Sequence, residues 1–190
     1  MTIASANGPS IKGSGFNSYV LAASESIGPS ALAAVTAALL PETAALLQHP
    51  PLAVSQIPIA TYVDFTEALL LHGLKNNERE LRRVGRIQLR NDLNGIYRLF
   101  IRMASPDYII TRAAQVYSTY WRNNGRIRTE KPSAKAVHVF YEDVPQIKSY
   151  FWELQSGAIQ SALETCGAEQ VSVEIERSTG TGALMLAQWK

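Results

Sequence analysis

The hydrophobic period of this chain first becomes strand-like at Gly125, and that change limits the folds the chain can adopt. Before Gly125, apolar residues recur every three or four positions, which is typical of amphipathic helices. After it, residues such as Val137, Val139 and Tyr141 alternate with more polar neighbours, which is typical of strands. The order predicts an α+β fold: a helical N-terminal half followed by a ββαββ antiparallel sheet with helices packed on one face.

Local signals place the individual elements. Ser105 and Pro106 give the clearest helix start in the chain, and Gly125 and Gly167 suit the residue after a helix. The helix next to Gly85 is expected to be amphipathic and could be broken at that glycine. The predicted helices cover 30–40, 42–48, 58–74, 77–89, 92–104, 106–122 and 144–166. The predicted strands cover 126–129, 134–141, 171–176 and 183–189, with hairpin turns at 131–133 and 180–182.

The domain organisation is expected to be simple. The 190 residues suit one domain, so we assign 1–15 to a flexible leader and 16–190 to a single α+β domain. Within it, 30–125 form the helical part and 126–190 the ββαββ part. A single cysteine excludes an intramolecular disulfide, and no apolar run approaches the ~20 residues of a membrane span. With no signal peptide pattern, we expect a cytoplasmic protein.

Positive charge is concentrated in the middle of the chain, where residues 75–135 hold 14 of the 18 lysines and arginines. Five of these arginines fall within an arc of about 100° on one predicted helix. This arginine stripe requires a facing anion or acidic surface. We expect a protein partner with an acidic face, such as the Glu174 and Glu176 side of a sheet, and keep a nucleic-acid polyanion as the alternative. The stripe consists of Arg79, Arg82, Arg83, Arg86 and Arg90.

Motifs for catalysis and metal binding are missing. The three histidines, His49, His72 and His138, do not have the spacing of a metal site. Cys166 lies at a predicted helix C-terminus, where the helix dipole disfavours a thiolate. The chain has no phosphate-binding glycine loop and no Gly-x-Ser-x-Gly sequence. The sequence therefore favours a non-catalytic protein without a metal site.

Aromatic residues are concentrated on two predicted helices. They could line a pocket for a small apolar ligand, or they could simply be core residues at helical spacing. The sequence leaves both interpretations open. The candidate ligand-binding residues are Tyr97, Phe100, Tyr117, Tyr120 and Trp121.

A family resemblance covers roughly residues 60–189. It rests on short motifs, and the chain resembles an uncharacterised bacterial family best known from myxobacteria. Its C-terminal half is similar in outline to the superfamily of haem–nitric-oxide-binding domains, vinyl-reductase-type ligand-binding domains and TRAPP vesicle-tethering subunits. The motifs are Arg83-Val84-Gly85-Arg86, Ser105-Pro106, Tyr120-Trp121-Arg122, Asn124-Gly125, Gly157-Ala158-Ile159, Leu163-Glu164-Thr165-Cys166-Gly167, Val171-Ser172-Val173-Glu174 and the terminal Trp189.

The resemblance implies small-molecule sensing or scaffolding. Its haem-binding branch has a helical histidine and a Tyr-x-Ser-x-Arg motif; residues 117–122 hold those residue types at another spacing. We leave the cofactor unassigned. The leading hypothesis is a non-catalytic sensory domain that binds a small apolar ligand and acts through protein partners or homodimerisation. The alternatives are a structural adaptor of TRAPP-like fold and a polyanion-binding protein that uses the arginine stripe.

Overall fold

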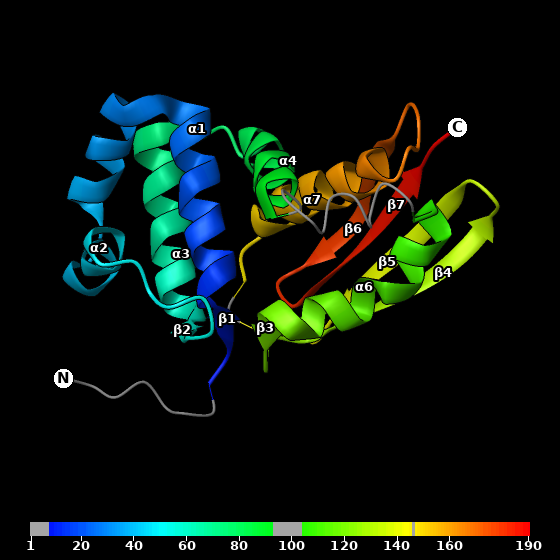
Figure 1. The fold of residues 1–190 in the computed structure, drawn as a ribbon, viewed down its shortest axis with the longest axis horizontal. Coiled ribbons are helices and arrows are strands. Elements are labelled where there is room, and N and C mark those ends of the chain that lie inside the picture. Colours follow the sequence, from blue (N-terminus) through cyan, green and yellow to red (C-terminus); the bar gives the residue numbers. More distant parts are fainter. Residues whose placement is uncertain (1–7, 93–103, 146) are drawn as a thin grey trace.

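The N-terminal half is helical, as predicted (Figure 1). The computed structural model describes residues 8–92, 104–145 and 147–190. After the short strand β1, the helices of this half pack side by side and end with α4, which reaches the second half (Figure 1). The elements are β1 Ser10–Lys12, α1 Gly13–Ala38, α2 Pro41–Gln48, β2 Gln56–Pro58, α3 Ile59–Ala68, the π-helix η1 Leu69–Gly73 and α4 Glu80–Asp92.

The first helix, α1, begins far earlier than its predicted start at Ser30. It is long and apolar enough to cross a membrane by length and composition. However, Gly28 has φ 78° and is followed by Pro29, so the backbone is not helical at this point. The stretch before it, 13–27, is about 22 Å long, shorter than the roughly 30 Å of a bilayer core. Its residues Phe16 and Tyr19 are buried in the protein core.

A small antiparallel sheet in the order β2-β1-β3 was not predicted. β1 lies between β2 and β3 Trp121–Arg122, with Ile11 opposite both Ile57 and Trp121. Residues 10–15, assigned to a leader from the sequence, thus form β1 and the start of α1. This sheet joins the start of the chain to the end of the helix that precedes β3.

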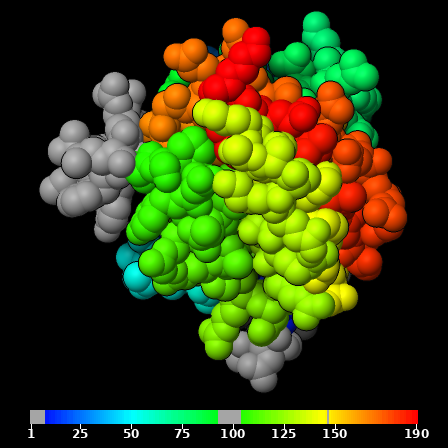
Figure 2. All heavy atoms as spheres, turned by 90° about the vertical axis from the view of Figure 1, so that its right-hand side faces the viewer, coloured from blue at the N-terminus to red at the C-terminus, as the bar shows by residue number. Residues whose placement is uncertain are grey.

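The C-terminal half is a four-stranded antiparallel sheet in the order β4-β5-β7-β6, with two helices on one face, as predicted. Tyr141 of β5 contacts both helices: its ring packs on Tyr117 of α6, and its hydroxyl donates to Gln155 of α7 at 3.1 Å. Figure 2 shows α6 beside the β4–β5 hairpin. The elements are α6 Pro106–Tyr120, β4 Arg126–Ser133, β5 Ala136–Glu142, α7 Phe151–Thr165, β6 Ser172–Thr179 and β7 Gly182–Gln188.

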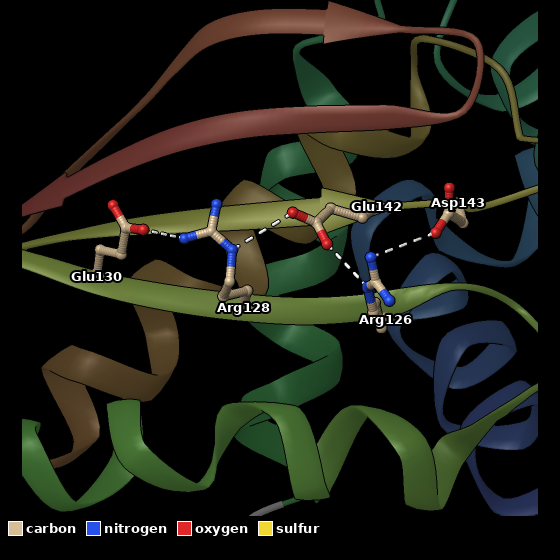
Figure 3. A network of polar contacts seen from close by, with 5 residues as sticks. All are labelled: Arg126, Arg128, Glu130, Glu142 and Asp143. Atoms are coloured by element: carbon tan, nitrogen blue, oxygen red, sulfur yellow. Dashed lines mark hydrogen bonds and ion pairs between the residues drawn. The ribbon is translucent and has the colours of Figure 1, made fainter.

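Charged side chains join β4 to β5 along the sheet (Figure 3). Glu142 lies opposite Arg126 in register and accepts hydrogen bonds from it and from Arg128, at 2.8 and 3.4 Å. Arg126 lowers the pKa of Glu142, and Arg128 also pairs with Glu130. The Arg128 guanidinium lies 3.8 Å from the centre of the Phe140 ring. The register of this hairpin is therefore supported by complementary charges as well as by its buried face.

Several predicted boundaries were wrong. The β4–β5 turn lies at 134–135 rather than 131–133, because β4 continues through Lys131 and Pro132. α7 begins at Phe151 rather than at 144. Gly85 does not break α4. Most of the helix predicted for 92–104 lies outside the described residues.

Aromatic side chains connect the two halves. Tyr62 of α3 stacks on Tyr19 of α1 at 4.7 Å between ring centres, and its edge packs on Trp121 at 5.2 Å. Trp121 in turn packs against Phe151 of α7 at 5.3 Å. All four side chains are buried, so the core continues from the helical half to the sheet.

Candidate ligand pocket

A pocket of about 240 Å³ lies where α4, α6 and α7 meet, next to β1 and β3. It is larger than the roughly 150 Å³ of an engineered apolar cavity that binds benzene. It is slightly smaller than the ~300–1,000 Å³ of pockets for drug-sized ligands. The space thus suits a small organic molecule. It is lined by Ile11, Gly15, Gln88, Leu89, Asp92, Ile109, Arg112, Ala113, Val116, Tyr117, Tyr120, Trp121, Ile127, Leu154, Gln155, Ala158, Ile159 and Ala162.

Helical spacing brings one face of α6 to the pocket. Ile109, Ala113, Val116 and Tyr120 are separated by four, three and four positions, so they share that face. The helix begins where the sequence predicts, because the Ser105 hydroxyl accepts a hydrogen bond from the Tyr108 amide at 3.2 Å. This cap fixes the phase of the helix, and with it the set of residues that reaches the pocket.

The opposite wall comes from α7, where small residues leave room. Ala158 and Ala162 lie one turn apart with Leu154 before them, on the face that lines the pocket. Alanine side chains at two successive turns create space that a leucine would fill. These two alanines could not be recognised from the sequence, because alanine at helical spacing is equally typical of close helix packing.

Aromatic residues form the floor of the pocket. Tyr117 and Trp121 stack with ring centres 6.0 Å apart, and the Tyr117 hydroxyl donates to the carbonyl oxygen of Asn124 at 2.7 Å. Burial raises the pKa of Tyr117, which stays neutral at physiological pH. Three of the five predicted residues thus line the pocket, namely Tyr117, Tyr120 and Trp121, whereas Tyr97 and Phe100 lie outside the described residues. Their role in binding stays a prediction.

Few polar groups reach the pocket, and most are already bonded. The Gln88 amide nitrogen donates to the carbonyl oxygen of Gly15 at 3.1 Å. The Gln155 amide oxygen accepts from Tyr141. Arg112 is exposed; it donates to Gln115 at 2.9 Å, and its guanidinium lies 5.6 Å from the centre of the Tyr108 ring. Burial raises the pKa of Asp92 to about 6, although a contact with the Ser18 hydroxyl acts in the opposite direction.

The arginine stripe meets acidic residues of its own chain. Arg82 pairs with Glu153 of α7 at 2.9 Å and also donates to the carbonyl oxygen of Val173 at 3.0 Å. Arg86 pairs with Glu164 at 2.8 Å. Arg90 lies 3.5 Å from Glu25. Three of the five arginines of the stripe therefore have an acidic partner within the chain.

The remaining members of the stripe, Arg79 and Arg83, are exposed and form no ion pair within the described residues. The acidic surface proposed as their partner is partly engaged elsewhere, because Glu176 lies 3.6 Å from His138. A role of the stripe in binding a partner stays a prediction.

The fold described above matches solved structures. A mutant H-NOX protein from K. algicida, unliganded with Fe(II), superposes with a TM-score of 0.70 and 11% identity, covering 95% of this chain and 97% of that one. An oxygen-binding H-NOX domain related to soluble guanylate cyclases superposes with a TM-score of 0.67 and 13% identity, covering 95% of each chain. A mutant H-NOX from T. Tengcongensis superposes with a TM-score of 0.65 and 12% identity, covering 95% of this chain and 98% of that one.

The chain has the H-NOX fold. This confirms the haem–nitric-oxide-binding branch of the resemblance at the level of fold; its myxobacterial, vinyl-reductase and TRAPP parts stay predictions. No family model matches the chain, and no curated protein is similar to it.

The H-NOX fold raises the question of haem, whose iron is commonly held by histidine or cysteine. The chain has three histidines and none lines the pocket: His49 and His72 are exposed, and His138 lies on β5 near Glu176. Cys166, the single cysteine, lies at the end of α7, and burial raises the pKa of its thiol to about 11. The residues present therefore do not fit a haem held by either side chain.

Other metal ligands are also dispersed. Within residues 8–92, 104–145 and 147–190, no three histidine, cysteine, aspartate or glutamate side chains lie together in a way that could hold a metal ion. The chemistry available in the pocket is thus apolar contact, aromatic stacking, a few hydrogen bonds and the charges of Asp92 and Arg112.

Proposed function

We propose that this protein is a small-molecule-binding sensory domain whose ligand lies between α4, α6 and α7. One observation carries the proposal: a mostly apolar space of about 240 Å³ lies between helices that belong to both halves of the fold. Ligand sites are typically concave and apolar with a few polar groups, and this pocket has that character. The neighbours with the same fold are named as oxygen-binding or Fe(II) proteins, which supports a sensory role.

The ligand is held by contacts rather than by a histidine–iron bond. Trp121 and Tyr117 offer a fixed aromatic surface, since Trp121 also packs on Tyr62 and Phe151. A planar apolar ligand can stack on such a surface without moving it. The pocket is therefore preorganised on this side.

The signal passes to a protein partner or across a homodimer. A ligand shifts a conformational equilibrium only by its difference in affinity for the two states. α6 carries one wall of the pocket and has exposed residues on its other side, including Ala114 and Gln115. A shift of α6 on ligand binding would change the exposed surface that a partner contacts. We expect this to take place in the cytoplasm of a bacterial cell.

Adjacent alanines on α6 allow a sharp test. Ala113 lines the pocket, whereas Ala114 is exposed and does not. Ala113→Phe fills the pocket and Ala114→Phe adds the same atoms at the surface. We expect 2-phenylethanol to bind the unmodified protein and Ala114→Phe in calorimetry, and to lose at least tenfold in affinity for Ala113→Phe. Equal binding to all three proteins would place the ligand elsewhere.

An adaptor function is the second candidate. It is supported by exposed leucines on the helical half, Leu21 of α1 and Leu71 of η1, at 53% and 57% exposure. Light scattering across a dilution series tests it, and a strict monomer at high concentration would count against assembly through these helices. Polyanion binding is the weaker alternative, because Arg82, Arg86 and Arg90 already have acidic partners.

A further inference from the structure

Two side chains on one face of α4 give the pocket its polar edge. Gln88 and Asp92 are four residues apart, so they lie one turn apart on that face, and both line the pocket. The other lining side chains nearby, Leu89 and Ile109, are apolar. A polar group of a bound molecule could therefore meet this edge of the pocket, or Arg112, Tyr120 or Gln155 elsewhere in its lining.

The contacts that Gln88 and Asp92 already make determine which of their atoms a ligand can use. The amide nitrogen of Gln88 donates to the carbonyl oxygen of Gly15 at 3.1 Å and lies 3.4 Å from the Ser18 hydroxyl. Its amide oxygen accepts no hydrogen bond from the described residues and is thus the atom left for a ligand. The Asp92 carboxylate has no ion-pair partner within residues 8–92, 104–145 and 147–190. Both groups are acceptors, which suits a molecule that brings N–H donors and a positive charge.

Neighbouring charged groups do not satisfy Asp92. On α1, Glu25 accepts from Asn91 at 2.8 Å and pairs with Arg90. On α6, Arg112 donates to Gln115 and lies over the Tyr108 ring. The pocket residues from α7 carry no charge: Leu154, Gln155, Ala158, Ile159 and Ala162.

Resting on the function proposed above, we infer that the pocket selects a small apolar amine, whose ammonium group is held by Asp92 and the amide oxygen of Gln88 while its hydrocarbon part lies against Trp121 and Ala158. Asp92 has the Ser18 hydroxyl as a hydrogen-bond partner but no cation among the described residues. A partly buried carboxylate without a counter-ion is costly, and a bound cation offsets that cost. An ammonium has three donors and no acceptor, so it can use both oxygens and leave the third N–H to water. Burial raises the pKa of Asp92 to about 6, so the carboxylate is available at neutral pH and above.

Three probes with the same hydrocarbon part separate the possibilities: 2-phenylethylamine, 2-phenylethanol and phenylacetate. At pH 8 we expect the amine to bind the full chain about tenfold or more tightly than the alcohol, as measured by calorimetry. Phenylacetate should bind most weakly. Tighter binding of phenylacetate than of the amine would point to Arg112 and overturn the inference.

Variants isolate the carboxylate. Asp92→Asn keeps the shape of the side chain and should reduce the preference for amine over alcohol to about one, without weakening the alcohol. Glu174→Gln removes an exposed carboxylate on β6 and should leave the preference unchanged. A preference that survives Asp92→Asn would overturn the inference.

The pH dependence of the unmodified protein gives a second measurement that does not depend on any variant. Lowering the pH from 8 to 5 protonates Asp92, while the amine stays charged, so amine affinity should fall toward that of the alcohol. Alcohol affinity should not change. Equal binding of amine and alcohol at pH 8 would refute the selection of an amine but would leave the pocket as the binding site. No binding of any probe would refute the proposed function itself.

Discussion

Gly85 of α4 and Gly157 of α7 lie against each other's helix backbone where the two helices cross. A Cβ atom at Gly85 would overlap the carbonyl oxygen of Leu154, and one at Gly157 would overlap that of Arg82. Because both obstacles are backbone atoms, neither can turn away. The two glycines therefore set how closely α4 approaches α7, and this crossing adjoins the pocket.

Alanine at either glycine should destabilise the protein. In an unconstrained helix, Gly→Ala is favourable by up to about 1 kcal/mol. Here we expect Gly85→Ala and Gly157→Ala each to lower the free energy of unfolding by about 1–3 kcal/mol, through overpacking. Chemical denaturation measures the change. Gly180→Ala is the matched control, since no atom lies within 4 Å of its Cβ position; a cost as large there would contradict this account.

Arg82 should matter more for stability than its neighbour Arg83. It joins Glu153 of α7 to the backbone of Val173, whereas Arg83 is exposed. We expect Arg82→Met to lower the free energy of unfolding by about 1–3 kcal/mol, because charged hydrogen bonds are lost. Arg83→Met should change it by less than about 0.5 kcal/mol. Similar effects of both substitutions in urea unfolding would show that the contacts of Arg82 contribute little.

Removing the charge of Asp92 should have a pH-dependent effect on stability. Burial raises its folded pKa to about 6 from an ordinary value of 3.8. Its protonated form thus favours folding at low pH, and this contribution is lost as the pH rises through about 6. Asp92→Asn should therefore raise the free energy of unfolding more at pH 8 than at pH 4, with a difference of at most about 3 kcal/mol between the two pH values. A difference in unfolding free energy that does not vary with pH would contradict the raised pKa.

Much of the fold could be predicted, because its longer elements carry clear periods and caps. Pro41 at the start of α2, the Ser105 cap of α6 and the alternation of Val137 and Val139 each lie where the structure has them. The small sheet could not be predicted, since strands of two or three residues have no measurable period. The early start of α1 was missed because Gly13 and Gly15 are poor helix formers. Gly13 is required there by close contact: a Cβ would overlap the carbonyl oxygen of Leu52.

The pocket was predicted only in part. Helical spacing indicated Tyr117, Tyr120 and Trp121, since large aromatic residues are visible in a sequence. Ala113 and Ala158 line the pocket by being small, and nothing in a sequence separates such alanines from those of a packed interface. Asp92 could not be found either, because its significance depends on the burial that tertiary packing supplies.

The most direct test of the pocket is a crystal structure of the protein soaked with bromobenzene, using the anomalous signal of bromine. The cavity exceeds the roughly 150 Å³ in which benzene binds, so the probe fits. We predict a single strong bromine peak between Ala113, Trp121 and Ala158, and its loss in Ala113→Phe. A pocket without bromine, or peaks of equal strength in the Ala113→Phe variant, would contradict the central claim that this protein binds small molecules between α4, α6 and α7.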